Sequence, residues 1–249
     1  MIFEKEDIDL TTVVQTVRDQ GLCIIKNWFT ENQAKDLKDE QLEFYSDIED
    51  NKRVMFLGDR KEQEEFNQGK AMALYPQSYN AFPYLVKNIF YDPFLNSVID
   101  TYYSGRCQKF LQTFCTYENK VVKDKDLGRH SRLHVDPYAA LKIAFFPSGA
   151  SKSNGALRVI PGSRQEGANI RIKFMSKNPA GLNGGVAHTM QEFKKQCAEL
   201  VTRNENEVVY MECTPRDLCV VDTDMYHGGG LIEEKGKERL AIYIHSRPL

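Results

Sequence analysis

The stretch Leu141-Lys142-Ile143-Ala144-Phe145-Phe146 is a short β-rich run, and turn-forming residues separate it from several similar runs after residue 105. β-branched and aromatic residues favour strands, and many short strands divided by turns are typical of sandwiches and barrels. The pattern therefore predicts a double-sheet core in this part of the chain. The runs cover residues 109–117, 141–146, 156–160, 207–211, 218–221 and 240–245.

Helical periodicity dominates the chain before this core. Apolar residues recur at helical spacing over 7–20, 31–44 and 84–103, with a break at Asp92-Pro93, and a short strand is expected at 22–26. The polar, poorly periodic residues 46–80 are expected to form a surface excursion. Such helices before a β core are typical of a scaffold that supports a sheet.

The predicted fold class is therefore mostly β with flanking helices, around a double-stranded β-helix core of the jelly-roll, cupin type. We expect a single domain over residues 1–249. Residues 1–105 would be mainly helical support with a short strand, and residues 106–249 would form the jelly-roll core. A lid-like insertion is expected at 163–206, because long insertions at a barrel mouth often cover a site.

Composition restricts the partners and the compartment. The 249 residues are 41% hydrophobic and 27% charged, and the net charge is −2 with a pI near 6.2. This balance gives no general attraction to nucleic acid or to an anionic membrane. The sequence has no apolar run of about 18 residues, no leader-like N-terminus and no Cys-x-x-Cys among its 6 cysteines. We expect a cytoplasmic protein with reduced cysteines and without nucleic-acid or membrane partners; the oligomeric state stays open.

The triplet His134-Val135-Asp136 precedes the first run quoted above and is the first candidate for chemistry. On an extended strand His134 and Asp136 point to one side and Val135 to the other. His227, before Gly228-Gly229-Gly230, could add a second imidazole and complete a two-His, one-carboxylate set that binds Fe(II) and leaves positions open. His-x-Asp alone is weak evidence, because a structural His hydrogen-bonded to a carboxylate gives the same pattern.

Arg239 opens the last β-rich run, after a charged hairpin that follows His227. An arginine on that strand could hold a carboxylate through a bidentate pair. Taken alone, arginine at such a place is typical of a surface ion pair; together with the two histidines it indicates an anchor for an acidic co-substrate.

The order of these motifs resembles the phytanoyl-CoA dioxygenase-like family of Fe(II)- and 2-oxoglutarate-dependent oxygenases. The resemblance implies that His134, Asp136 and His227 hold Fe(II) and that Arg239 anchors the distal carboxylate of 2-oxoglutarate, with O2 as the oxidant. A carboxylate at Asp136 favours hydroxylation or another oxidation over chlorination, since related halogenases have a small residue there. The residues that carry the resemblance are His134-Val135-Asp136, 154–163, Asp217 to Asp222, Tyr226 to Gly230, Arg239 and the N-terminal stretch 21–29.

This chain departs from the family's pattern in two places. Arg164 stands where many members have His, and Ala241 stands where many have a hydroxyl residue beside the anchoring arginine. The second difference leaves open which side chain supplements Arg239. Thr113, Tyr117 and Lys142 are unranked candidates for this part of the co-substrate site.

A small-molecule substrate is the expectation, and an anionic one is the hypothesis. Arg171 and Lys173 in the 163–206 insertion could pair with a negative group, and Arg132 could reach it from the metal-facing side. Tyr138, close to the triplet, completes this group of candidate substrate residues. The alternative is that these charges are solvated surface residues.

Two other function classes stay open from the sequence. The same triad could serve a cupin-type hydrolase or isomerase with Zn or Mn, because the ligand types alone do not fix the metal. The chain could also be a non-catalytic jelly-roll binding protein, although a binding role would not require an intact triad.

Overall fold

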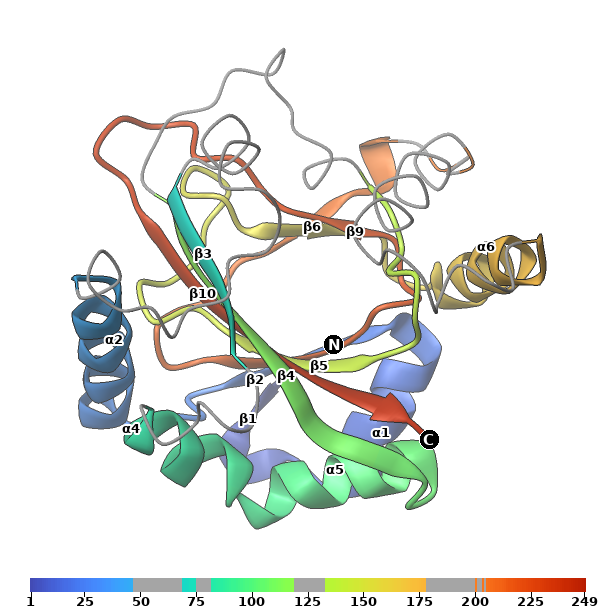
Figure 1. Ribbon diagram of the computed structural model, residues 1–249, viewed down its shortest axis with the longest axis horizontal. Helices are drawn as coiled ribbons and strands as arrows, with labels where there is room; N and C mark the ends of the chain where they lie inside the picture. The colour runs from blue at the N-terminus through green and yellow to red at the C-terminus, as the bar shows by residue number, and fades with distance from the viewer. Residues whose placement is uncertain (47–68, 75–81, 119–132, 178–199, 201–202, 204) are drawn as a thin grey trace.

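Two β-sheets face each other in the protein, and helices cover the outer side of the larger one (Figure 1). The computed structural model describes residues 1–46, 69–74, 82–118, 133–177, 200, 203 and 205–249. The large sheet has the strand order β1-β2-β8-β5-β10-β4-β3, and the small sheet has the order β7-β6-β9. The strands are β1 (Ile2–Glu4), β2 (Leu22–Lys26), β3 (Gly69–Leu74), β4 (Cys107–Glu118), β5 (Leu141–Phe145), β6 (Leu157–Val159), β7 (Val209–Met211), β8 (Leu218–Asp222), β9 (His227–Gly228) and β10 (Arg239–Pro248).

Capping residues mark the ends of two of the helices. Asp9 caps the first long helix by accepting a hydrogen bond from the Thr12 N–H, and Gly21 ends it in a left-handed conformation with φ 81°. Asp92 caps another helix, which has Pro93 in its first turn. The helices are α1 (Leu10–Gln20), α2 (Glu31–Ser46), α4 (Pro83–Leu85), a π-helical turn (Val86–Phe90), α5 (Pro93–Tyr103) and α6 (Arg164–Lys177), with short 3-10 turns at Lys5–Asp7 and Glu205–Glu207.

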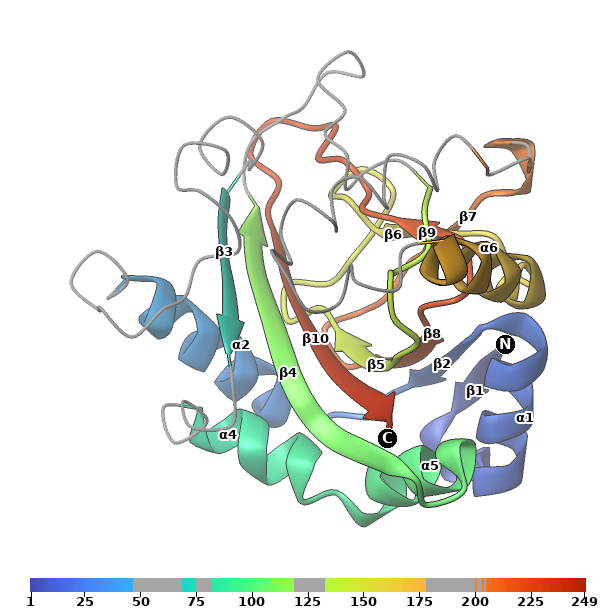
Figure 2. The same ribbon diagram turned by 45° about the vertical axis from the view of Figure 1, so that its right-hand side comes forward.

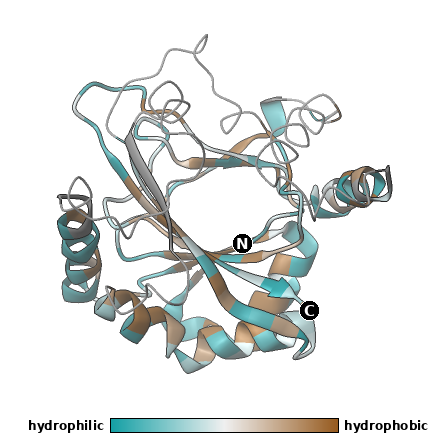
Figure 3. Ribbon diagram, in the orientation of Figure 1, coloured by the Kyte–Doolittle hydropathy of each residue, from teal (hydrophilic) through white to brown (hydrophobic). Residues whose placement is uncertain are grey.

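The main core lies between the large sheet and the helices that cover it. Figure 3 shows apolar residues along α5 and along strands of the large sheet. Leu240, Ile242 and Ile244 of β10 belong to this core, together with Val13 and Val17 of α1. Alternate residues of a strand point to opposite faces, so the residues between them on β10 face the small sheet. Ala241 follows this rule and packs in a second core between the two sheets.

Two facing sheets with helices on the outside make the jelly roll that the sequence predicts, and Figure 2 shows the small sheet β7-β6-β9 opposite the large one. The expected helices and strands are present in the described chain, with ends shifted by a few residues. Residues 46–80 differ from expectation, because Gly69–Leu74 forms β3 and pairs antiparallel with β4. Gly-Lys-Ala-Met-Ala-Leu has no β-branched residue, so the pairing with β4, and not local propensity, makes it a strand.

Two further features concern composition. The cysteines of the described chain are free thiols: Cys23, Cys107, Cys115, Cys213 and Cys219. Among the described helices, none is long and apolar enough to cross a bilayer.

Candidate metal centre

Two backbone segments that are far apart in the sequence place His134 and His227 side by side. The two residues form an isolated antiparallel bridge, in which each N–H donates to the other's carbonyl at 2.8 and 2.9 Å. Directly opposed residues on neighbouring strands point their side chains to the same face. The imidazole centroids consequently lie 4.7 Å apart, and both side chains are buried.

Asp136 completes the group from the same segment as His134. Its Oδ1 lies 3.9 Å from His134 Nε2 and 3.7 Å from His227 Nε2. One potential ligand atom from each of the three residues lies within 4.8 Å of the others. The structure therefore brings together the three residues that the sequence pattern predicts. Two imidazole nitrogens and one carboxylate oxygen suit a divalent transition metal such as Fe(II).

Neighbouring groups orient the ligand atoms. His227 Nδ1 lies 2.9 Å from the Met225 carbonyl oxygen, so Nδ1 carries the proton and donates it, and Nε2 keeps its lone pair toward Asp136. Lys142 on β5 places Nζ 2.7 Å from Asp136 Oδ2 and 3.5 Å from His227 Nε2. Lys142 engages Asp136 Oδ2, whereas Asp136 Oδ1 faces both imidazoles. This donor set fits a metal bound by one oxygen and two nitrogens.

Helix α6 packs against both of the segments that carry the candidate ligands, around Val135 and around Tyr226. Val135, between the two ligands, packs with Tyr226 and with Phe174 of α6 in a separate apolar cluster. Gly167 makes this close approach possible, because a Cβ there would lie 2.5 Å from Val135 Cγ1 and closer still to the carbonyl oxygen of Asp224. The Ser163 hydroxyl, just before α6, accepts a hydrogen bond from the Tyr226 N–H at 2.8 Å.

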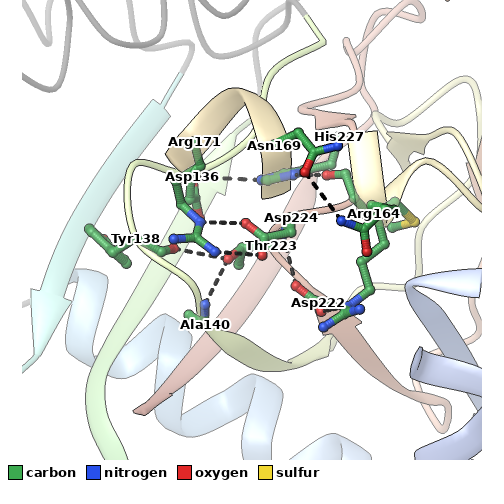
Figure 4. A network of polar contacts seen from close by, with 12 residues as sticks. Asp136, Tyr138, Ala140, Arg164, Asn169, Arg171, Asp222, Thr223, Asp224 and His227 are labelled. Atoms are coloured by element: carbon green, nitrogen blue, oxygen red, sulfur yellow. Dashed lines mark hydrogen bonds and ion pairs between the residues drawn. The ribbon is translucent and has the colours of Figure 1, made fainter. Parts of the chain in front are cut away.

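Two arginines of α6 also hold the loop that leads from β8 to His227. Arg171 forms a bidentate pair with buried Asp224, at 2.6 Å from Nε to Oδ1 and 2.8 Å from Nη2 to Oδ2. Arg164 pairs with buried Asp222. Figure 4 shows Arg171 pointing toward Asp224 and Arg164 lying beside Asp222. The first part of the predicted insertion is therefore a docked helix, whereas residues 178–199 lie outside the described chain.

Arg239 is buried at the start of β10 on the inner face. Its Nη2 forms an ion pair with Glu118 of β4, and its Nη1 donates to the carbonyl oxygens of Gly155 and Gly230. Its Nε is buried without a partner in the described chain. The guanidinium thus has a carboxylate partner already, and Glu118 stands where an acidic co-substrate would compete for it.

The other candidate co-substrate residues lie on opposite faces of the large sheet. Lys142 lies on the inner face with the metal-site residues. Thr113 pairs across the sheet with Ile244, and Tyr117 pairs with Leu240. These partners pack against the helices, so Thr113 and Tyr117 occupy the helix-covered face, away from Arg239. The structure does not bring Thr113 and Tyr117 to the candidate site, so they are not part of the proposed co-substrate site.

The candidate substrate residues that the structure describes lie in different surroundings. Arg132 lies outside the described residues. Arg171 is engaged by Asp224, and Lys173 is an exposed residue of α6. Tyr138 lies near the metal site, with its ring 3.5 Å from the Arg247 guanidinium carbon.

Three inward residues of β10, Tyr243, His245 and Arg247, were not predicted from the sequence as site residues. Their spacing could have indicated them, because every second residue of a strand faces the same side as Arg239. Burial raises the pKa of Tyr243 to about 12, although the charge of Arg239 acts in the opposite direction. Tyr243 therefore stays a neutral hydroxyl between Arg239 and the other two residues.

Together, the facing sheets and the inward His134, Asp136 and His227 define a jelly roll with a two-His, one-carboxylate site. No protein-family model matches the chain, and no curated protein matches it. Among the solved structures similar to this chain are two of the non-heme alpha-ketoglutarate-dependent epimerase SnoN from nogalamycin biosynthesis. The first aligns at 11% identity with a TM-score of 0.60 over 96% of this chain and 82% of SnoN. The second, in complex with Fe3+, alpha-ketoglutarate and nogalamycin RO, aligns at 12% identity with a TM-score of 0.60 over 96% and 83%. At this identity the likeness establishes the fold.

Proposed function

We propose that the protein is an Fe(II)- and 2-oxoglutarate-dependent oxygenase that hydroxylates a small molecule. The observation that carries the proposal is the buried convergence of His134, Asp136 and His227, with an arginine on the same inner surface. The SnoN complex with Fe3+ and alpha-ketoglutarate supports the cofactor pair, because that protein shares the fold. The resemblance to the phytanoyl-CoA dioxygenase-like family supports hydroxylation as the outcome.

Each residue then has a defined task. His134 Nε2, His227 Nε2 and Asp136 Oδ1 would hold the metal, and Lys142 holds Asp136 Oδ2 in place. When bound, Fe(II), 2-oxoglutarate and O2 supply the oxidation, and 2-oxoglutarate leaves as succinate and CO2. Arg239 binds the distal carboxylate once Glu118 releases it. Burial of His134, Asp136 and His227 would keep bulk water from the reacting groups.

One observation favours a second candidate. Because Glu118 already neutralises Arg239, the chain could be a cupin-type hydrolase or isomerase that uses the same triad with Zn or Mn and needs no 2-oxo acid. The two functions differ in one measurable requirement, namely 2-oxoglutarate.

The test is an anaerobic titration of the Fe(II)-loaded protein with 2-oxoglutarate, followed by the visible metal-to-ligand charge-transfer band. We expect the band in the wild type, its loss in His134→Ala, and a weaker 2-oxoglutarate affinity in Arg239→Met. Arg216→Met is the matched control, since Arg216 also donates to a backbone carbonyl, that of Phe29. Stoichiometric iron without a band would refute the oxygenase and would favour the Zn or Mn enzyme.

A further inference from the structure

His245 is a buried side chain on the inner face of β10. It is 3% exposed, and within the described chain neither Nδ1 nor Nε2 has a partner. Buried polar groups are normally hydrogen-bonded, because an unmade bond leaves the cost of desolvation uncompensated. Two orphaned nitrogens on one ring therefore indicate that a group absent from the protein itself completes their bonding.

The surroundings of His245 are basic and aromatic. Across the sheet His245 pairs with Lys142 on one side and with Gln112 on the other. The ring of Phe114 lies 4.8 Å from the His245 ring, and that of Tyr138 lies 6.4 Å away. Arg247, on the same face of β10, stacks on Tyr138, and its Nη2 donates to Gln112 Oε1 at 3.2 Å.

The charges around His245 favour an anion. Burial, followed by the charge of Lys142, holds the pKa of His245 well below its usual value, so the imidazole is neutral and offers one donor and one acceptor. In the described chain Arg247 has no carboxylate partner, and its Nε is buried and unbonded. Among the described residues, the charged or titratable groups around His245 include Lys142, Asp136, Arg247, His227 and Tyr138. Of these, only Asp136 is acidic, and it belongs to the metal site.

The position of this group separates it from the co-substrate anchor. Arg239 begins β10, whereas His245 and Arg247 lie near its other end. Lys142, the cross-strand partner of His245, touches the metal ligand Asp136. A molecule held by His245 and Arg247 would thus approach the metal from the side opposite to Arg239, where a second reactant is needed.

We propose that His245 and Arg247 form the recognition site for a carboxylate of the primary substrate, with Arg247 as its ion-pair partner and the His245 imidazole as its hydrogen-bond donor. The apolar part of the acid would lie against Phe114 and Tyr138. This inference rests on the proposed function, and it places the substrate among organic acids that carry an apolar body.

The experiment compares acids with their neutral amides. Benzoate, phenylacetate and hexanoate, each beside its primary amide, are titrated calorimetrically into the anaerobic protein loaded with Fe(II) and 2-oxoglutarate, and into the protein without them. We expect the wild type to bind at least one acid about tenfold more tightly than its amide, because a charge-assisted pair is lost in the amide. Arg247→Met should reduce this preference to less than about twofold, and His245→Leu should weaken binding of the acid about fivefold.

Arg18→Met is the matched control, since Arg18 also lies over a tyrosine ring, that of Tyr102, on the outer helices. It should leave the preference for acids unchanged. Equal binding of acids and amides by the wild type, or an undiminished preference in Arg247→Met, overturns the inference. The charge-transfer band is recorded in every variant: acid binding without any band would refute the proposed function and leave this site standing, whereas a band without a preference for acids would refute this site alone.

Discussion

Replacing Gly167 with alanine should disturb the metal site through the helix behind it. The added Cβ would lie 2.5 Å from Val135 Cγ1 and closer to the carbonyl oxygen of Asp224, well inside ordinary contact distance. Alanine gains about 1 kcal/mol in helix propensity over glycine. Overpacking of this kind costs about 1–3 kcal/mol, and we expect the upper end or beyond because one neighbour is backbone. The net expectation is a loss of about 2 kcal/mol in the free energy of unfolding.

The same displacement should weaken iron binding. Val135 lies between two ligands and Asp224 precedes the third, so a shift of α6 moves both segments. We expect Gly167→Ala to bind Fe(II) about tenfold more weakly, which corresponds to about 1.4 kcal/mol. Urea unfolding measures the stability, and competition with a chelator measures the affinity.

Gln165→Ala is the control on the same helix, because Gln165 is exposed and, among the described residues, bonds only to Asn169. Its stability should stay within about 0.5 kcal/mol of the wild type. If Gly167→Ala matched this control in both measurements, α6 would not be packed as described. If it lost stability but kept its iron affinity, the helix would support the fold without positioning the ligands.

Three further predictions concern charged groups. Glu118→Gln should bind 2-oxoglutarate about tenfold more tightly in the anaerobic titration, because Arg239 loses a competing carboxylate; unchanged affinity would rule out this competition. Arg171→Met should lower the free energy of unfolding by about 3 kcal/mol, since Asp224 would stay buried and unpaired, and adding Asp224→Asn should recover most of it. A full loss in the double variant would contradict this cause. The free energy of unfolding of the wild type should fall as the pH drops below about 6.5, by up to about 1.4 kcal/mol per pH unit. The reason is that His245 takes up a proton in the unfolded chain, whereas the lowered pKa of His245 keeps it neutral in the folded protein. His245→Leu should lack this contribution in urea unfolding at several pH values, and an unchanged dependence on pH would refute it.

Local patterns in the sequence were enough for the fold class and for the three candidate ligands. Period-two alternation puts His134 and Asp136 on one face, and Val135 does pack on the other. The break predicted at Asp92-Pro93 coincides with the start of α5, where Asp92 is the cap. These features depend only on neighbours along the chain, which is why they could be predicted without coordinates.

The residues that sequence reasoning misplaced depend on pairing between distant strands. Alternation shows that Thr113 and Tyr117 share a face, but only the register of β4 against β10 decides which face it is. The same register opposes Arg239 to Glu118, a partner that no local pattern indicates. Arg171 likewise reads as a free cation in the sequence, and only docking of α6 gives it Asp224.

The reciprocal backbone bonds between His134 and His227 also constrain when the centre can form. The two segments lie far apart in the sequence, so bringing them together costs conformational entropy of the intervening chain. Tertiary contacts that form afterwards have to offset this cost. During synthesis, His134 and Asp136 emerge from the ribosome well before their partner imidazole. A nascent chain therefore offers only part of the candidate coordination set until the segment that carries His227 has been made.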